Sequence, residues 1–233
     1  PLKDKSFREY AAYASHMDNA IGQIIESLDL NGQREDTIIV FSSDNGAKTE
    51  TTEQDVEKYP GCQEVSPRLG SNLPFRGAKG QLYEGGIRTP TAVNWKTHLS
   101  PRTLDQPINI SDWMPTFTNL LQATPRHDPK WDGIDIWPLI TSNPTKSSER
   151  AIYWNFKEGS QYCIRQGDWK LISSNDSENQ KDELFNIAKD PYEQKDLSVE
   201  LPSKVTHLLR IIENQRRSDG SSKRKDVNST LVN

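Results

Sequence analysis

The sequence has few cysteines, no long apolar run and no excess of charge of one sign. Its two cysteines, Cys62 and Cys163, lack the close spacing of a metal site, so they form either a disulfide or two separate thiols. No stretch is long and apolar enough to cross a membrane. The 29 basic and 33 acidic side chains nearly balance at a net charge of −4, and the lack of a basic surplus argues against nucleic acid as a partner.

The sequence is also poor in apolar residues for an enzyme built on a buried sheet. Its hydrophobic fraction is 33% and its mean hydropathy is −0.82. The chain begins at Pro1, without an initiator methionine or an apolar signal region. These features predict a fragment whose apolar partner segments lie outside the chain, and they leave the oligomeric state open.

An apolar run followed by oxygen-bearing side chains is the most informative stretch. Residues 37–41 are β-branched and aromatic without polar alternation, which is typical of a parallel strand covered on both faces. Asp44 and Asn45 follow, and a carboxylate beside an amide carbonyl suits Ca²⁺ or Mg²⁺. Neighbouring strand residues point to opposite faces, so these two could share one ion only if the chain turns, as Gly46 permits. The alternative is a plain Asp-Asn-Gly turn without a ligand.

A glycine-rich stretch further along the chain predicts an anion site. Four glycines fall between Gly77 and Gly86, which lets the backbone approach a ligand closely. Lys79 lies between two small residues, and a lysine beside exposed backbone N–H groups suits phosphate or sulfate oxygens. The alternative is an ordinary solvated loop lysine.

The first part of the chain has the pattern of an α/β arrangement. A capping box from Ser6 to Glu9 and apolar residues at three- and four-residue spacing predict a helix of about twenty residues that ends at Asn31-Gly32. This helix leads into the 37–42 strand as the second half of a βαβ crossover whose first strand is expected outside this chain. The sequence then predicts a long surface loop, a weak strand, a short strand and a helix, over 47–70, 87–95, 107–110 and 111–122. The segment 131–137 carries apolar anchors that should close over the core.

The pattern changes after a polar stretch at 143–148, so we expect one domain over 1–147 and a small subdomain over 148–215. Short strand-like runs separated by glycines and polar residues predict antiparallel hairpins over 151–156, 162–165, 169–172 and 184–186. Pro202 begins a final amphipathic helix that should pack on this sheet. Residues 216–233 are polar and charged without periodicity, which predicts a disordered tail.

Several of these segments together resemble the type I sulfatase family, in its arylsulfatase B-like branch, within the alkaline-phosphatase-like superfamily. The matching stretches are Phe41 to Gly46, Leu73 to Arg88, Ile110 to Thr116, Asp132-Gly133, Ile164 to Leu171, and Glu183 to Asn186 with Asp190-Pro191. Their order and spacing cover nearly the whole chain. The resemblance implies an α/β fold in which an incomplete alkaline-phosphatase-like sheet, sandwiched by helices, is followed by a small antiparallel sheet with a C-terminal helix.

The chemistry that the resemblance implies is calcium-dependent hydrolysis of sulfate monoesters, carried by a small molecule or a glycan. In that family the Asp-Asn pair ligates Ca²⁺, which implies this role for Asp44 and Asn45, and the lysine of the glycine-rich block contacts the sulfate, which implies this role for Lys79. Family members also need a Cys-x-Pro-Ser-Arg segment whose cysteine becomes formylglycine. Neither Cys62 nor Cys163 lies in such a segment, so we expect a C-terminal portion that is inactive by itself.

Two other functions stay open at this point. A phosphodiesterase or phosphonate hydrolase of the same superfamily would use similar metal-bearing strand ends, with Ser or Thr in place of the cysteine nucleophile. A non-catalytic glycan- or calcium-binding relative would bind without turnover. The stretch from Tyr153 to Phe156 occupies the place where relatives can present a pocket histidine, so the identity of the sulfate ester that is the substrate stays open.

The resemblance also bears on localisation, because the family points to the lysosome, secretion or the bacterial periplasm. Three triplets fit the N-glycosylation pattern, at Asn109, Asn175 and Asn228. They favour a eukaryotic secretory route.

Overall fold

The computed structural model describes residues 5–49, 70–142, 149–176 and 179–219. Most of the expected 47–70 loop, including Cys62, lies outside these residues, so both alternatives for Cys62 and Cys163 stand. The chain divides into two compact units, residues 1–144 and 145–233. The domain boundary that the sequence predicts falls within 143–148, also outside the described residues.

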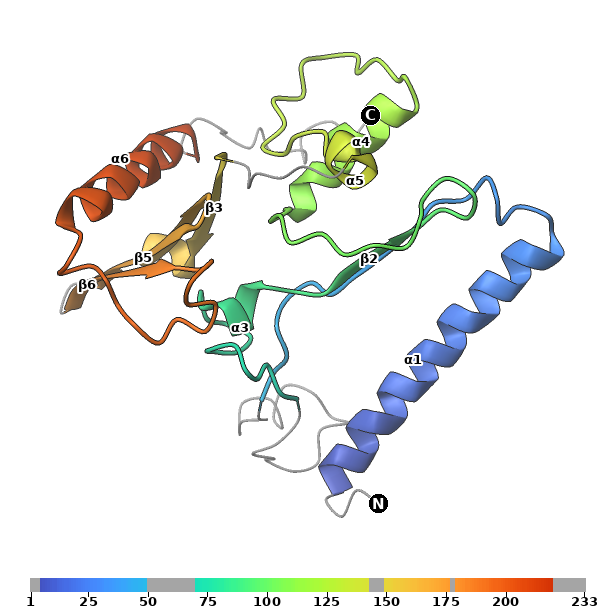
Figure 1. Ribbon diagram of the computed structural model, residues 1–233, viewed down its shortest axis with the longest axis horizontal. Helices are drawn as coiled ribbons and strands as arrows, with labels where there is room; N and C mark the ends of the chain where they lie inside the picture. Colours follow the sequence, from blue (N-terminus) through green and yellow to red (C-terminus); the bar gives the residue numbers. More distant parts are fainter. Residues whose placement is uncertain (1–4, 50–69, 143–148, 177–178, 220–233) are drawn as a thin grey trace, which may run out of the picture. The chain divides into compact units, whose positions relative to one another are not determined.

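The first unit has one long helix followed by two short strands and several short helices among its described residues (Figure 1). The elements are α1 (Lys5–Leu30), β1 (Ile39–Ser42), α3 (Glu84–Ile87), β2 (Thr91–Asn94), the 3₁₀ helix η1 (Ile110–Asp112), α4 (Trp113–Leu120) and α5 (Trp137–Thr141). The expected N-terminal helix is therefore confirmed as α1, with 26 residues. It ends where Gly32 adopts a φ of +67°, a conformation that costs glycine little.

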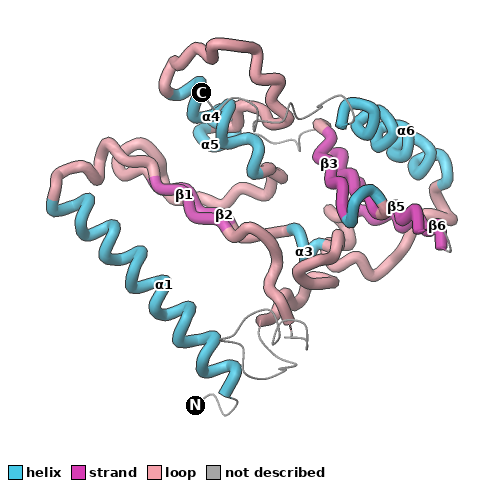
Figure 2. Tube along the Cα trace, turned by 180° about the vertical axis from the view of Figure 1, so that it is seen from behind, coloured by secondary structure: helices cyan, strands magenta, loops and turns pink. Residues whose placement is uncertain are grey.

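The parallel neighbour expected for β1 lies outside this chain, so the parallel pairing stays a prediction. β1 pairs antiparallel with β2, with Ile39 opposite Asn94 and Ser42 opposite Thr91 (Figure 2). Phe41 is 41% exposed, so β1 is not covered on both faces. In the described part of this unit, β1 and β2 form a two-stranded ribbon, where the sequence predicts an incomplete sheet sandwiched by helices. The sequence did not predict the antiparallel neighbour, because an apolar run indicates how a strand is buried but carries no information on the direction of its neighbour.

The core of the first unit forms where α4 and α5 meet the ribbon. Trp113, Ile136 and Ile140 are buried together, with Val40 and Val93 of the ribbon packed against them. The sequence predicts a short strand, or the approach to one, over residues 107–110; they form no strand, and Ile110 opens η1. The expected helix start at 111–115 is confirmed, but the capping residue is Asn109, two residues before Ser111.

That cap is a reciprocal pair of hydrogen bonds. The amide of Ser111 donates to Oδ1 of Asn109 at 3.0 Å, and the amide of Asn109 donates to Oδ2 of Asp112 at 2.7 Å. This is a capping box, which satisfies backbone donors that a helix start leaves open. The second carboxylate oxygen of Asp112 accepts from the amide of Ile134 at 3.0 Å, so one buried side chain fixes both α4 and the segment before α5.

The second unit is an antiparallel meander with a helix on one face. Its strands β3 (Ala151–Phe156), β4 (Gln161–Gln166), β5 (Trp169–Asp176) and β6 (Asn179–Asn186) lie in the order β3-β4-β5-β6. The 3₁₀ helix η2 (Lys157–Gly159) joins β3 to β4, and α6 (Pro202–Asp219) follows the sheet. The expected hairpins and C-terminal helix are therefore confirmed.

Helix α6 lies along one face of the sheet, as Figure 1 and Figure 2 show from opposite sides, and an apolar cluster joins the two. Val205, Leu208 and Ile212 of the helix pack on strand residues that include Ile164 and Leu171. Val205, Leu208 and Ile212 follow the three- and four-residue spacing of one helix face, which is why the sequence identifies them.

Two sequence boundaries in this unit are wrong. The sequence predicts that one strand ends at residue 172 and the next begins at residue 184, with polar residues between them. In the structure β5 continues to Asp176 and β6 begins at Asn179, so that Ser173 pairs with Asp182 and Ser174 with Lys181. Helix α6 continues to Asp219, so residues 216–219 are helical, while 220–233 lie outside the described residues. None of the described helices has the combination of length and apolar character that crossing a bilayer requires.

Candidate functional site

The structure brings the end of β1 and the glycine-rich turn together. The amide of Gly46 donates to the carbonyl of Gly86 at 2.8 Å, and the amide of Lys79 donates to the carbonyl of Ala47 at 3.2 Å. These two contacts join segments that are more than thirty residues apart in the sequence. The backbone of Lys79 therefore lies beside the residues that follow Asp44 and Asn45.

Glycine is required where these two segments touch. A Cβ atom on Gly46 would lie 1.8 Å from the carbonyl oxygen of Gly85, and one on Gly86 would lie 2.0 Å from that of Gln81. Real Cβ atoms essentially never approach other atoms so closely. The glycines noted in the sequence thus allow backbone to pack on backbone, which fixes the spacing between the strand end and the lysine turn.

Asp44 and Asn45 point to the same side of the chain. The side-chain amide of Asn45 donates to Oδ1 of Asp44 at 2.7 Å, and the hydroxyl of Ser43 donates to the carbonyl of Asn45 at 2.9 Å. β1 ends at Ser42, so the chain has already left the strand and the alternation of side chains no longer applies. The turn that ion sharing requires is therefore present.

This donor pair fits part of a calcium site. Asp44 is exposed and Asn45 is half-buried, so their oxygens are reachable from solvent. A carboxylate and an amide carbonyl are hard oxygen ligands of the kind that Ca²⁺ takes, but calcium uses six to eight of them. Among the described residues, no group of three or more His, Cys, Asp or Glu side chains could hold a metal ion. Asp44 and Asn45 would therefore supply only part of a calcium shell.

Lys79 is exposed at the surface of the glycine-rich turn. Its backbone is anchored to Ala47, and Gly77 and Gly80 on either side have φ values of +85° and +87°. An exposed ammonium on an anchored backbone can contact an anion that approaches from solvent. Its contact with sulfate stays a prediction, as do the metal roles of Asp44 and Asn45.

Two arginines brace the same turn. The guanidinium carbon of Arg76 lies 3.8 Å from the ring centroid of Tyr83, and that of Arg88 lies 4.7 Å from the ring of Phe75. Arg88 also lies 3.6 Å from the carboxylate of Glu84, whose side chain is buried. These stacked and charged contacts stiffen the loop around Lys79.

Sequence reasoning assigned no role to Asn72, although it touches both segments. Its side chain accepts a hydrogen bond from the amide of Ala47 at 2.7 Å and donates to the carbonyl of the same residue at 2.8 Å. An asparagine before Leu73-Pro74 resembles any loop asparagine, so no sequence signal could have found this contact.

Comparison with known proteins places this site in a family. The family model described as Sulfatase matches residues 2–123, and the one described as N-sulphoglucosamine sulphohydrolase, C-terminal, matches residues 78–216. The chain is 30% identical to Arylsulfatase J of Mus musculus over 250 residues, which is 87% of this chain and 39% of that protein. It is 33% identical to Steryl-sulfatase of Mus musculus over 149 residues, 62% of this chain and 22% of that protein.

Solved structures give the same picture. The chain is similar to the crystal structure of Ps i-CgsB in complex with k-i-k-neocarrahexaose, with a TM-score of 0.75 and 29% identity over 92% of this chain and 44% of that one. The Phosphonate Monoester Hydrolase of Agrobacterium radiobacter shares the fold, with a TM-score of 0.60 and 17% identity over 88% of this chain and 40% of that one. The chain thus spans less than half the length of these relatives. It belongs to the sulfatase family of the alkaline-phosphatase-like superfamily.

Proposed function

We propose that this chain forms the C-terminal part of a calcium-dependent sulfuric ester hydrolase of the arylsulfatase type. The observation that carries the proposal is the joining of the Asp44–Asn45 turn to the Lys79 turn by the hydrogen bond from Lys79 to Ala47. A metal-binding pair and a cation on adjacent backbone are what an oxyanion such as sulfate requires.

In this proposal each residue has a distinct task. Asp44 and Asn45 hold Ca²⁺ through their side-chain oxygens. Bound calcium offsets negative charge on the sulfate oxygens. Lys79 places its ammonium against the same group, where its positive charge stabilises charge that develops during ester cleavage. The formylglycine nucleophile would come from polypeptide outside this chain, because the sequence has no Cys-x-Pro-Ser-Arg segment.

The substrate in this proposal is a sulfated small molecule or a sulfated glycan, in a lysosomal or extracellular setting. Relatives named Arylsulfatase J and Steryl-sulfatase support the reaction class, and the similar structure with a bound carrahexaose supports a glycan. Candidate N-glycosylation triplets support the secretory setting.

Phosphonate or phosphodiester hydrolysis is the second candidate. The likeness to a phosphonate monoester hydrolase is one of fold alone at 17% identity, and the same strand ends serve both ester types. The nucleophile decides between them, so the sequence upstream of this chain distinguishes formylglycine chemistry from that of Ser or Thr. A binding relative without catalysis would retain calcium affinity and show no turnover.

The test uses the complete protein that contains this chain, produced together with a formylglycine-generating enzyme. Turnover is measured on p-nitrocatechol sulfate and on an aryl phosphonate, and calcium affinity is measured by titration calorimetry. We expect sulfate turnover, a rate loss on the order of 10²- to 10³-fold for Lys79→Ala, and weakened calcium binding for Asp44→Ala and Asn45→Ala.

Lys96→Ala is the matched control, because Lys96 is an exposed lysine in the same unit whose ammonium lies 3.6 Å from the carboxylate of Asp29, away from both turns. We expect it to leave turnover and calcium affinity unchanged. Equal losses for Lys79→Ala and Lys96→Ala would contradict the assignment of Lys79. Turnover by the isolated chain at the rate of the complete protein would contradict the partial-site proposal.

A further inference from the structure

We propose that Asn72 is a positioning residue, which holds the Lys79 turn at a fixed distance from the Asp44–Asn45 turn. The inference rests on the proposed function, because it concerns the geometry of that site. Asn72 itself contacts backbone groups of both turns and is half-buried.

The side chain of Asn72 pairs with both backbone polar groups of one residue, Ala47, as a neighbouring strand would. Its Oδ1 accepts from the amide of Ala47 at 2.7 Å, while its Nδ2 donates to the carbonyl of Ala47 at 2.8 Å. The second Nδ2 hydrogen is directed to the carbonyl of Gly77 at 3.3 Å. Both donor hydrogens of the amide and one acceptor position are thus engaged.

The carbonyl of Ala47 is the shared point of this arrangement. It accepts from Nδ2 of Asn72 at 2.8 Å and from the amide of Lys79 at 3.2 Å. Ala47 lies two residues after Asn45, and Gly77 lies two residues before Lys79. One side chain therefore ties the segment of the metal donors to the segment of the cation, on each side of the direct backbone contact.

No other side chain of similar size can make this set of bonds. An alanine loses all three, and a carboxylate keeps the acceptor but presents a second oxygen to the carbonyls of Ala47 and Gly77. Because the Asn72 side chain sets the distance between cation and metal in this proposal, its removal should lower activity roughly 10- to 100-fold, as does the removal of side chains that orient metal ligands. A purely structural asparagine would change stability without acting through Lys79.

A double-mutant cycle in the complete protein separates these two roles. Asn72→Ala, Lys79→Ala and the double variant are compared by kcat/KM on p-nitrocatechol sulfate. If Asn72 acts by positioning Lys79, Asn72→Ala costs roughly 10- to 100-fold in the wild-type background and little in the Lys79→Ala background, because coupled residues are not additive. Equal losses in both backgrounds would overturn the proposal.

The Asn72→Asp variant adds a pH profile that a structural role would not produce. The carbonyls of Ala47 and Gly77 oppose a negative charge at this position, so the introduced carboxyl donates a hydrogen bond only in its protonated form. We expect the activity of Asn72→Asp, relative to wild type, to recover as the pH falls. A constant ratio at all pH values would count against the proposal.

Hydrogen exchange tests the same contact without relying on turnover. In Asn72→Ala we expect the amides of Ala47 and Lys79 to exchange faster, by about tenfold or more, because local opening becomes easier. Asn119→Ala is the matched control, since Asn119 lies in the same unit and donates to Asp135 at 2.6 Å, away from both turns. Unchanged exchange in Asn72→Ala would overturn the proposal. Faster exchange in a complete protein that lacks sulfate turnover would refute the proposed function and leave the positioning contact supported.

Discussion

At Gly46 the chain has no room for a side chain, and this single position controls how the end of β1 and the Lys79 turn meet. The nearest obstacle to a Cβ atom is the carbonyl oxygen of Gly85 at 1.8 Å, followed by its carbonyl carbon at 2.8 Å. Both are backbone atoms, which cannot rotate away as the end of a flexible side chain could. Gly46 therefore acts through packing, whereas the role proposed for the nearby Asp44 depends on its carboxylate oxygens.

We expect Gly46→Ala to separate the strand end from the lysine turn. The added methyl group forces backbone apart, at a cost of about 1–3 kcal/mol or more in the free energy of unfolding, and it weakens calcium binding by moving Asp44 relative to Lys79. Thermal unfolding and calcium titration measure the two effects. Gly22→Ala is the control, because nothing lies within 4 Å of a Cβ atom at this position of α1. We expect it to stabilise the helix by about 0.5–1 kcal/mol. A Gly46→Ala protein with wild-type stability and calcium affinity would refute this account of the packing.

Asp196 illustrates how a carboxylate can organise a loop in the second unit. Its Oδ1 accepts from the amide of Leu184 at 3.0 Å and from that of Ser198 at 2.8 Å. Burial, the largest influence, raises the pKa of this carboxyl, but these hydrogen bonds and the charge of Lys181 together lower it below its ordinary value.

The stability that Asp196 contributes is therefore present above the unfolded-state pKa near 3.9 and is lost as the pH falls through the lower folded-state value. We expect Asp196→Asn, which retains the acceptor oxygen, to be less stable than wild type at pH 7. The difference in stability between wild type and Asp196→Asn should become smaller below about pH 4. Thermal unfolding monitored by circular dichroism from pH 7 to pH 2 measures it. Asp18→Asn on the exposed surface of α1 should show no such narrowing, and the same pH trend in both variants would argue against a local cause.

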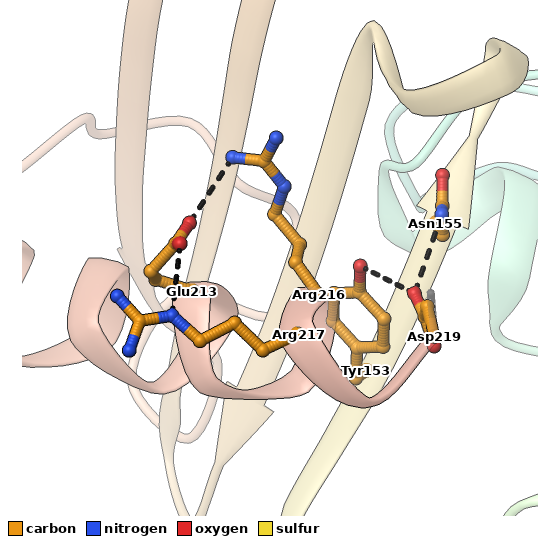
Figure 3. A network of polar contacts seen from close by, with 6 residues as sticks. All are labelled: Tyr153, Asn155, Glu213, Arg216, Arg217 and Asp219. Atoms are coloured by element: carbon orange, nitrogen blue, oxygen red, sulfur yellow. Dashed lines mark hydrogen bonds and ion pairs between the residues drawn. The ribbon is translucent and has the colours of Figure 1, made fainter. Parts of the chain in front are cut away.

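At the scale of elements, the end of α6 is fastened to the edge strand β3. Figure 3 shows Asp219, in the last turn, directed toward β3, where its Oδ2 accepts from the hydroxyl of Tyr153 at 3.1 Å and from the amide of Asn155 at 3.3 Å. Tyr153 also stacks on Tyr162, with ring centroids 6.2 Å apart. The pKa of Tyr153 is raised, first by burial and then by the hydrogen bond to Asp219 and its charge.

Tyr153→Phe retains the stacked ring and deletes the hydroxyl that contacts Asp219. We expect a loss of no more than about 1 kcal/mol in the free energy of unfolding at pH 7, because the contact is exposed to solvent. The raised pKa means that this stabilisation is complete below the unfolded-state value near 10 and is lost as the pH rises through the higher folded-state value. Urea unfolding at pH 7 and pH 11 checks the expectation. Tyr13→Phe, at a tyrosine that is 78% exposed on α1, should leave the free energy of unfolding unchanged at both pH values. If wild type exceeded Tyr153→Phe in free energy of unfolding by more at pH 11 than at pH 7, the predicted pH dependence would be contradicted.

The elements that could be predicted from the sequence are those whose signal is local. The spacing of Val205, Leu208 and Ile212 identifies the buried face of α6, and Asn31-Gly32 marks the end of α1. The pairing of β1 with β2 depends on residues about fifty positions apart, so local pattern could not give its direction. The polar ends of β5 and β6 were missed because their ladder pairs Ser173 with Asp182, and hydrogen bonding rather than apolar burial holds them.

In the candidate site, too, local features of the sequence were predictable and long-range contacts were not. Asp44, Asn45 and Lys79 were predicted from residue type and glycine context, and the structure joins the backbone of Lys79 to that of Ala47, two residues after Asn45. Asn72 was missed because its role consists of side-chain contacts to backbone atoms 25 residues away. Such contacts leave no periodicity, and asparagine is common in loops for other reasons.

At the scale of the whole molecule, helix α1 exposes large apolar side chains along its length. Tyr13, Met17, Ile24 and Leu30 are all more than half exposed, although Met17 and Ile24 lie on the apolar stripe with Ala14, Ile21 and Leu28. Soluble chains rarely expose a continuous apolar stripe of this length without a partner. The chain also spans only 39% of Arylsulfatase J and 44% of the Ps i-CgsB structure. Both facts bear on how the isolated chain should behave in solution.

We expect the isolated chain to self-associate as its concentration rises, because association removes the stripe of α1 from water. The double variant Met17→Lys/Ile24→Lys should shift sedimentation velocity profiles toward the monomer. It should leave the unfolding temperature nearly unchanged, since neither residue is buried. Glu26→Lys is the matched control, because it adds a lysine to the same helix at an exposed polar position outside the stripe. Association that persists in the double variant would refute the apolar stripe as its cause. Equal relief by Glu26→Lys would mean that the charge of the chain, and not the stripe, governs association.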